Sequence, residues 1–594
     1  MQKGTQRDRK IDNATVLNRR SFIASSAALL SAAAFGTGLA GCAPQQATPG
    51  GSDSNAGSSQ GIQASWSTPP APIEEASITE TIQTEVLVIG GGNAGQYAAC
   101  AAAEAGAKVL VLEKNSSIGT TQRYAIGAVD SRYQLEKGIH IDKRDLVETL
   151  CQYASHRCDQ RLIKLWADKS GEVIDWLGDV LAEVEPSVSV HIETDTGNSS
   201  HGNYKTFATW HNVQTSDECL LSLDFVGQKL LKLGVEVMTE TPMLRLEREG
   251  DKSGRVTGVI AQDKDGNYIR VNASKGVILC TGGYASNEEM MREANPLVAN
   301  NCTTLLMPGA LNAGDGIKAA VWVGAVKQEQ GTAMVFDRGG VPPGTPGGCL
   351  YDSPGIEVHL GSQPFLKVNQ KGERFCNESV PYDFIYAAAC EQPNSTWCMV
   401  WDANWVEQVR QFHTIACARV FPSDEGKFLL FGTDTNADAN PKSTASGFNT
   451  ELFMEQVLIP AGVVVEAQTI EELAEKLQVP ASAFVATVKR YNELCAKGED
   501  EDFGKESYRM LPIDTPPYRG TTIGGELLCT IDGLRINEKI QVVDAQGEPI
   551  EGLYAAGNDS GGFFANNYPE LIPGVNMGRG ITFGFLAGQN AARS

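Results

Sequence analysis

The sequence predicts an α/β protein that contains a Rossmann-like nucleotide-binding domain. Residues 84–114 of the 594-residue chain carry the three observations behind this prediction: a run of β-branched residues, an alanine-rich segment and a second apolar run. Glu85–Ile89 is predicted to be a buried strand because it is short, apolar and rich in β-branched side chains. Asn93–Ala105 is predicted to be a helix, and Lys108–Leu112 a second strand. A strand, a helix and a strand in such close succession indicate a βαβ unit.

Three glycines stand where the first predicted strand meets the predicted helix. Gly90, Gly92 and Gly95 match the pattern G-x-G-x-x-G, and Glu113 ends the second predicted strand. The first glycine permits a tight turn, the second lets the backbone approach a pyrophosphate, and the third lets the helix pack closely on the strand. An acidic residue in the position of Glu113 binds a ribose hydroxyl, and the helix N-terminus attracts phosphate. The segment therefore predicts a dinucleotide-binding site.

Four later segments extend this prediction to a flavin. They are "VILCTGGYASN" (277–287), "NAGDGIKAAVWVGA" (312–325), "IEGLYAAGNDSGG" (550–562) and "PGVNMGRGITFGFLAG" (573–588). The last one opens a predicted helix whose N-terminal amides favour the negative charge of a reduced flavin ring. With the glycine pattern, and in this order, the segments resemble the FAD-dependent oxidoreductase 2 family, which includes fumarate reductase, the succinate dehydrogenase flavoprotein and 3-ketosteroid dehydrogenase. The resemblance covers residues 84 to 590, approximately.

The resemblance implies a non-covalently bound FAD and a set of residues that hold it. These residues are Gly90, Gly92, Asn93, Ala94, Gly95, Glu113, Lys114, Thr120, Thr121, Gly127, Ala128, Val237, Thr281, Gly282, Gly283, Asp315, Gly557, Asn558, Gly574, Val575, Asn576 and Met577.

The resemblance also implies the architecture: an α/β fold with a Rossmann-like FAD-binding domain and an inserted α+β capping domain that closes over the flavin. The expected organisation is a signal at 1–41, a disordered linker at 42–82, the first part of the FAD-binding domain at 83–330, the cap at 331–505 and the second part of the FAD-binding domain at 506–594.

The N-terminus predicts export and lipid attachment. Arg19 and Arg20 are followed by Phe22 and a mildly apolar stretch, which is the pattern of a twin-arginine signal. Leu39-Ala40-Gly41-Cys42 resembles a bacterial lipoprotein processing site, so a lipid on Cys42 is expected to anchor the mature chain to the outer face of the cell membrane. The alternative is a cleaved signal with an incidental cysteine. Export by this route also suggests a cofactor that is bound before translocation.

Charge and motif content limit the partners. The formal net charge is −23, and the predicted signal removes more basic than acidic side chains, so a nucleic-acid partner is excluded. One glycine fingerprint is present and no second, and there is no haem-attachment motif. Electrons are therefore expected to come from a separate membrane or extracytoplasmic donor.

The predicted cap resembles that of the fumarate reductases, apart from its catalytic residue. The segment 368–378 keeps the pattern V-N-x-x-G-x-R-F-x-N-E, including Arg374 and Glu378. Tyr382 stands where those enzymes carry their proton-donating arginine. Their C-terminal clamp arginine is replaced by "NNYPELIPG" (566–574), and the clamp histidine near residues 521–532 is absent. Without these clamp residues, the free energy of desolvating the two carboxylates of fumarate would not be offset, so fumarate reduction is disfavoured.

At these positions the sequence resembles the 3-ketosteroid dehydrogenases. Their two catalytic tyrosines match Tyr382 and Tyr568 of this chain. The resemblance implies that Tyr382 exchanges a proton with the carbon next to a carbonyl, and that Tyr568 and a backbone amide near Gly574 hold the carbonyl oxygen. The predicted function is an exported reductase of a carbonyl-activated C=C in an enone, steroid, unsaturated lactone or aryl acrylate. Alternatives are the reverse dehydrogenation, a fumarate-type reductase and an electron-transfer lipoprotein without its own substrate.

Cysteine and histidine patterns indicate no metal site. None of the 14 cysteines lies in a C-x-x-C pair, and most are expected in the core. An iron–sulfur site has no support from their spacing, although the sequence leaves it open. Residues 191–211 hold three of the seven histidines, and we expect a surface or pocket-lining loop there.

Overall fold

The computed structural model describes residues 65–119, 125–192, 200–201, 204–215, 219–250, 252–306, 312–353, 355–418, 420–422, 428–430 and 453–594. The predicted signal peptide, the predicted lipid site at Cys42 and most of the predicted linker lie outside these ranges. In the described part of the chain, no helix is both long enough and apolar enough to cross a bilayer.

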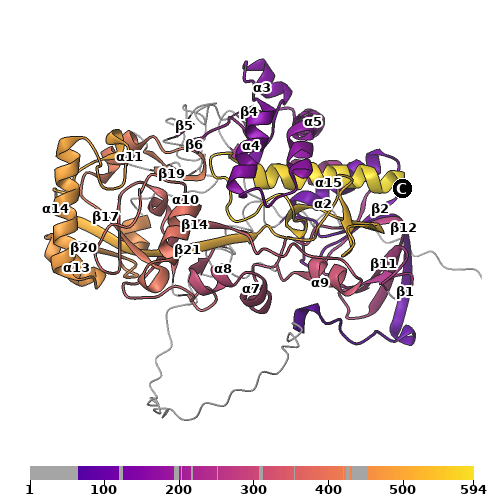
Figure 1. Cartoon of the computed structure of the whole chain (residues 1–594). Coiled ribbons are helices and arrows are strands. Elements are labelled where there is room, and N and C mark those ends of the chain that lie inside the picture. The colour runs from indigo at the N-terminus through magenta and orange to yellow at the C-terminus, as the bar shows by residue number, and fades with distance from the viewer. Residues whose placement is uncertain are drawn as a thin grey trace, which may run out of the picture.

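The first sheet confirms the predicted α/β class (Figure 1). Strand β1 (Ile78–Ile89), helix α2 (Asn93–Glu104) and strand β2 (Val109–Leu112) form the expected βαβ unit. The parallel strands run in the order β9-β2-β1-β12-β23. The other strands of this sheet are β9 (Glu236–Met238), β10 (Met243–Arg248), β11 (Val256–Gln262), β12 (Tyr268–Leu279), β22 (Gln541–Val543) and β23 (Pro549–Ala555).

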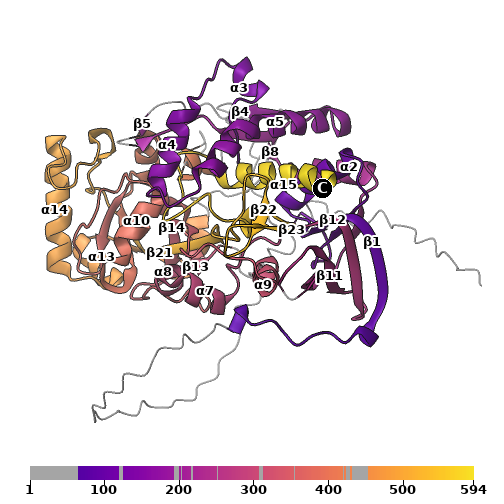
Figure 2. The same ribbon diagram turned by 45° about the vertical axis from the view of Figure 1, so that its right-hand side comes forward.

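The C-terminal helix α15 (Val575–Arg593) lies against α2, as Figures 1 and 2 show. Glycines make this approach possible. A Cβ atom at Gly584 would lie 2.2 Å from the carbonyl oxygen of Ala94, and one at Gly588 would lie 2.1 Å from that of Ala98. The backbones therefore touch directly, and the position of α15 is fixed by that of α2.

Residues 83–330 contain further helices. They are α3 (Arg132–Glu136), α4 (Lys143–Tyr153), α5 (Gln160–Val184), α6 (Leu223–Lys232), α7 (Glu288–Ala294), α8 (Pro296–Asn301) and α9 (Asp315–Trp322). Small sheets join β3 (Ile126–Gly127), β4 (Ser189–Ile192), β7 (Trp210–Gln214) and β8 (Cys219–Leu220), and β5 (Ser200–His201) with β6 (Tyr204–Lys205).

A second sheet forms the other half of the molecule. Its strands are β13 (Cys302–Leu305), β14 (Ala333–Val341), β15 (Ile356–Glu357), β16 (Leu366–Asn369), β17 (Trp397–Trp401), β20 (Val464–Ala467) and β21 (Tyr518–Thr530). Its helices are α10 (Tyr382–Cys390), α11 (Trp405–Phe412), α13 (Ile470–Leu477) and α14 (Ala481–Lys497), and a π-helical turn spans Met454–Leu458. Strands β18 (Val420–Pro422) and β19 (Phe428–Leu430) pair separately.

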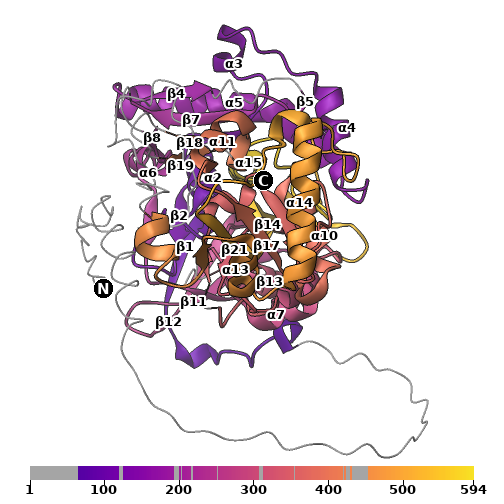
Figure 3. The same cartoon turned by 90° about the vertical axis from the view of Figure 1, so that its left-hand side faces the viewer.

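This second sheet is buried on both faces. Along β17, Trp397, Met399 and Trp401 pack into one apolar cluster, and Cys398 and Val400 pack into another. The alternation follows the two-residue period of a strand. The second cluster includes residues of α13 and α14, which lie in front of the sheet in Figure 3.

An ion-pair network supports the segment that matched the reductase cap. The Arg374 guanidinium donates to Glu378 at 2.9 Å and to Asp500 at 2.8 Å. Although burial opposes ionisation, these contacts hold the pKa of Glu378 below its usual range, and that of Asp500 is about 2. The network keeps the turn before α10 in place.

The second sheet includes strands that lie outside residues 331–505. Strands β13 and β21 pair within it, and both lie in stretches expected to belong to the FAD-binding domain. The boundaries at 330 and 505 stay predictions.

We predict that Gly584→Ala destabilises the protein, because its methyl group would collide with the α2 backbone. A loss of about 1–3 kcal/mol is expected from such overpacking. The thermal unfolding midpoint of the purified protein measures this loss. Gly227→Ala in α6 is the matched control, because its nearest neighbour would lie at an ordinary 3.4 Å. The control variant should be as stable as the wild type or more stable, because alanine has a higher helix propensity than glycine. Equal midpoints for both variants would contradict the packing argument.

Candidate active site

The glycine turn after β1 forms a cradle. Gly90 has φ +97°, and a Cβ atom at Gly95 would lie 1.9 Å from the Gly90 carbonyl oxygen. A Cβ atom at Gly92 would meet nothing within 4 Å, so this side of the turn is open. The buried Oδ1 atom of Asn93 has no hydrogen-bond partner among the described residues. The open side of the turn fits a phosphate at the N-terminus of α2.

Residues at the end of β2 lie beside this cradle. The Glu113 carboxylate accepts from the N–H groups of Gly91 at 2.8 Å and Asn115 at 2.9 Å, which orients it next to the glycine turn. Lys114 pairs with Asp315 at 2.8 Å, so these two predicted FAD ligands meet. Val237 lies in β9, opposite Val111 of β2. Thr120 and Thr121 lie outside the described residues.

A third group of predicted ligands is held together by Asp559, which sequence reasoning missed. Its carboxylate accepts from the Thr281 hydroxyl at 2.8 Å and from the Gly283 N–H at 3.1 Å. It follows Gly557 and Asn558 directly, so it ties their turn to Thr281, Gly282 and Gly283. A Cβ atom at Gly557 would lie 3.1 Å from the Cβ atom of Ala94, which joins this turn to the cradle.

The N-terminus of α15 completes the site. The Gly127 N–H donates to the carbonyl oxygen of Gly574 at 2.8 Å, and a Cβ atom at Gly127 would lie 2.6 Å from the Gly574 backbone. Gly574 (φ +73°) precedes the first turn, which contains Val575, Asn576 and Met577. Ala128 is fully buried beside this contact.

A buried arginine that sequence reasoning missed fixes two predicted ligands. Arg579 donates to Oδ1 of Asn558 at 3.2 Å and to Oδ1 of Asn576 at 2.9 Å. Burial lowers its pKa to about 10. The cradle, the Asp559 turn and the first turn of α15 thus lie around one region at the carboxyl ends of β1, β2, β12 and β23, where a dinucleotide binds in such sheets. These residues fit FAD.

The segments that carry Tyr382 and Tyr568 meet, because the side chain of Glu570, two residues after Tyr568, accepts the Tyr382 N–H at 3.0 Å. Both tyrosine side chains are buried, with exposed fractions of 2% and 3%. Burial raises the pKa of Tyr382 well above its ordinary value, and the electrostatic influence of Tyr568 and Glu570 raises it further. The ring of Tyr382 packs edge-on against Phe336, 4.9 Å between centroids. Its hydroxyl has no hydrogen-bond partner among the residues that the structure describes.

Tyr568 faces the start of α15. Burial raises the pKa of its hydroxyl well above the ordinary value, while a hydrogen bond from the backbone N–H of Asn576 lowers it. The amide that meets Tyr568 is that of Asn576, in the first turn of the helix. The expectation that an amide near Gly574 holds the substrate oxygen beside Tyr568 stays a prediction.

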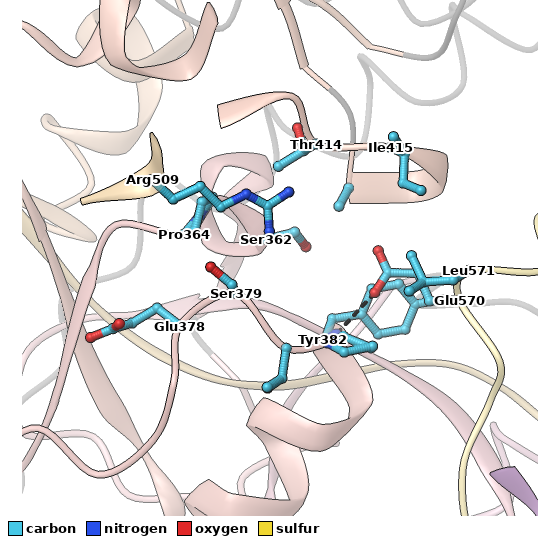
Figure 4. Close-up of a pocket in the computed structure, with 13 residues that line it drawn as sticks. Ser362, Pro364, Glu378, Ser379, Tyr382, Thr414, Ile415, Arg509, Glu570 and Leu571 are labelled. Carbon is cyan, nitrogen blue, oxygen red and sulfur yellow. Dashed lines mark hydrogen bonds between the residues drawn. The ribbon is translucent and has the colours of Figure 1, made fainter. Parts of the chain in front are cut away.

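A small cavity opens beside Tyr382 (Figure 4). It lies where the start of α10, the chain around 414–418 and the segment 570–571 meet. Its walls are formed by Ser362, Pro364, Glu378, Ser379, Val380, Pro381, Tyr382, Thr414, Ile415, Ala418, Arg509, Glu570 and Leu571.

Polar side chains of this cavity escaped the sequence analysis. The Arg509 guanidinium points into it in Figure 4, is 1% exposed and donates from Nε to the Phe412 carbonyl at 2.9 Å. Burial lowers its pKa. The Ser379 hydroxyl is buried without a partner in the described part of the chain. Burial also raises the pKa of Glu570 to about 8. Only Glu570 had a sequence signal, since it lies in the segment that replaces the clamp arginine.

The histidine-rich stretch 191–211 contains strands β4 and β5–β7 rather than one loop. His211 is fully buried: Nδ1 donates to the Thr209 carbonyl at 2.8 Å, and Nε2 accepts from the Ser131 hydroxyl at 2.7 Å. Burial lowers its pKa to about 4, so it stays neutral and structural. Across the described ranges, no cluster of His, Cys, Asp and Glu could hold a metal ion.

Comparison with known proteins agrees with this geometry. The FAD binding domain family model matches residues 85–570. A vinyl phenol reductase from Lactiplantibacillus plantarum is 30% identical over 513 residues, which cover 86% of this chain and 95% of that protein. An NADH:fumarate oxidoreductase from Klebsiella pneumoniae is 27% identical over 86% of this chain, which spans 48% of that longer protein.

Among solved structures, a 3-ketosteroid-Δ4-(5α)-dehydrogenase from Rhodococcus jostii matches with a TM-score of 0.63 and 23% identity, over 88% of this chain and all of that chain. This likeness shows a shared fold. The chain belongs to the FAD binding domain family, and it is an FAD-dependent oxidoreductase.

Proposed function

We propose that the protein reduces a carbonyl-activated C=C bond, with Tyr382 as the proton donor. One observation carries this proposal: two buried tyrosines lie on segments that meet, Tyr568 faces the α15 N-terminus, and the Tyr382 hydroxyl has no partner among the described residues. Bound, reduced FAD would supply a hydride from N5 to the β-carbon of the alkene. The vinyl phenol reductase, a relative whose name indicates alkene reduction, supports this reaction class.

Tyr568 and the α15 N-terminus hold the carbonyl oxygen in this proposal. Negative charge collects on that oxygen as the hydride arrives. The Asn576 N–H donates to the Tyr568 oxygen, which leaves the phenol proton for the substrate oxygen, and the positive end of the α15 dipole adds to its effect. Donors fixed in a dry site stabilise such charge strongly.

Tyr382 then protonates the α-carbon. Its raised pKa keeps the phenol neutral at physiological pH, so the proton is always present before the reaction. A phenol is a weak acid toward most groups but is adequate toward an enolate. The proposed substrates therefore carry a carbonyl in conjugation with the alkene: enones, steroids, unsaturated lactones or aryl acrylates.

The reverse dehydrogenation uses the same groups, with Tyr382 as base, and its raised pKa makes the phenolate that would start that reaction scarce.

We also propose that the cofactor is held without a covalent bond, that the chain is exported by the twin-arginine route, and that a lipid on Cys42 anchors it at the membrane. A separate membrane or extracytoplasmic protein would then deliver electrons. The paired Arg19-Arg20 and the Leu-Ala-Gly-Cys segment support this part of the proposal.

Tyr382→Phe should retain FAD yet slow acceptor-dependent reoxidation of the reduced flavin by about 10²-fold or more, because the alkene loses its proton donor. The measurement is anaerobic stopped-flow absorbance with chemically reduced protein and a panel of enones, lactones, aryl acrylates and dicarboxylates. An unchanged rate would remove Tyr382 from the mechanism. Efficient reoxidation by fumarate alone would favour the fumarate-type alternative, and no reoxidation by any acceptor would favour the electron-transfer lipoprotein.

Tyr568→Phe should lower the rate constant for the same reoxidation by about 10²-fold, because the developing oxyanion loses the hydroxyl that donates to it. Acceptor affinity should change far less than the rate, since the hydrogen bond strengthens mainly in the transition state. Stopped-flow rates at several acceptor concentrations separate these two effects. A change confined to affinity would instead make Tyr568 a binding residue only.

Cys42→Ser should release the protein from the membrane fraction without altering its flavin absorbance. Fractionation of cells that express the wild type and the variant, followed by mass spectrometry of the N-terminal peptide, measures this. Wild-type protein without a lipid on Cys42 would refute the anchor.

A further inference from the structure

Glu570 is a buried carboxyl group placed between the two tyrosines. It lies two residues after Tyr568, and its N–H donates to the Tyr568 carbonyl oxygen at 3.0 Å. Its Oε2 atom accepts the backbone N–H of Tyr382 at 3.0 Å, where α10 begins. The side chain is 4% exposed. Glu570 therefore contacts the backbone of both segments that carry the proposed catalytic hydroxyls.

Glu570 also shares a cavity with Tyr382. Both line the space shown in Figure 4, where the carboxylate lies beside the tyrosine ring. The cavity volume is about 20 Å³. This is enough for one water molecule between the residues that line it.

The surroundings favour the protonated form of Glu570. Burial is the main cause that raises its pKa to about 8, and the carboxylate of Asp337 adds to the shift. The Tyr382 N–H, Arg338 and Arg509 act in the opposite direction. The titratable and charged groups that face Glu570 are Asp337, Arg338, Lys367, Tyr382, Asp383, Arg509, Tyr153 and Tyr568.

Tyr382 needs a nearby source of protons. Once its hydroxyl has protonated a carbon, a phenolate remains in a buried site that strongly disfavours charge. The hydroxyl has no hydrogen-bond partner in the described structure that could return a proton directly. The enzyme must restore the phenol before the next turnover.

We propose that Glu570 is the proton reservoir of Tyr382. This rests on the proposed function, in which Tyr382 is the proton donor. In each cycle the Tyr382 O–H bond breaks as the substrate C–H bond forms. The Glu570 O–H bond then breaks, directly or through one water, as the Tyr382 O–H bond re-forms. Glu570 finally takes a proton from solvent. No electrons move in these proton transfers, because the hydride supplies both electrons of the reduction.

Other groups near Tyr382 are less suited to this role. Arg509 retains its proton too strongly, because the pKa of a guanidinium exceeds that of a carboxylic acid even when burial lowers it. Asp383 is buried and its pKa is raised, but it does not line the cavity. The buried Tyr153 hydroxyl has a pKa raised above that of a free phenol and would be a poor donor. Glu570 combines a place in the cavity with a suitable acidity.

Glu570→Gln tests the proposal, because glutamine keeps an oxygen that accepts the Tyr382 N–H but carries no acidic proton. Reduced holoprotein is mixed anaerobically with the acceptor that reoxidises the wild type. Single-turnover reoxidation should stay within about two-fold of the wild type, since the first proton comes from Tyr382 itself. Steady-state turnover with an artificial donor should fall about 10-fold or more.

The pH profile gives a second expected result. Glu570 must be protonated to act, so wild-type turnover should fall as pH rises through about 8. That inflection should be absent from Glu570→Gln. Difference infrared spectroscopy of the protein without acceptor provides a readout apart from activity: a protonated carboxyl band should titrate near pH 8 in the wild type and be missing in the variant.

Controls separate the reservoir from a structural role and from failure of the proposed function. Glu526→Gln removes a buried carboxyl of β21 that does not line the cavity, and both rates should be unchanged. Equal losses in single-turnover and steady-state rates in Glu570→Gln would make Glu570 a structural contact and overturn the reservoir, as would unchanged steady-state turnover. Tyr382→Phe should slow single turnover as well. If it does not, the proposed function fails, whatever Glu570 does.

Discussion

The backbone contact between Gly127 and Gly574 is the constraint on which the site depends. Any side chain at Gly127 would overlap the α15 N-terminus, and the N–H of Gly127 bonds to the carbonyl of Gly574. Together with the α2 contacts of Gly584 and Gly588, this fixes the helix in direction and in depth. The amides at its start therefore meet both the expected flavin position and the Tyr568 hydroxyl.

Charge in this protein is distributed in two ways. Around Arg374, buried carboxylates have cationic partners, and their pKa values are held low. Beside Tyr382, the buried carboxyls of Glu570 and Asp383 form no ion pair with the described residues, and their pKa values are raised. Removing a paired buried charge costs stability, whereas a neutral buried acid can exchange a proton. The paired carboxylates around Arg374 suit a structural role in the second sheet. The carboxyls beside Tyr382 suit proton transfer.

The sequence predicted the parts of this protein that depend on local pattern. The βαβ unit, the glycine turn and the helix at 575 follow from periodicity and from the steric role of glycine, and the structure confirms the α/β class. It did not predict Asp559 or Arg579, whose roles arise from contacts between segments distant in the chain. Arg509 was missed for the same reason, because no local pattern shows that an arginine near the end of the predicted cap is 1% exposed.

In the proposed mechanism, the tyrosine at position 382, where the resemblance to the fumarate reductases implies an arginine, has consequences beyond one side chain. A guanidinium starts with a positive charge, and neighbouring ionic groups can reprotonate it after it donates. A buried phenol starts neutral and becomes an isolated anion after it donates. Its raised pKa restricts it to strongly basic acceptors such as an enolate carbon. A protein that makes this exchange then needs an acid of intermediate pKa nearby, and Glu570 stands in the segment that replaces the clamp arginine. The two departures from the fumarate reductase pattern are thus coupled by the chemistry of one proton.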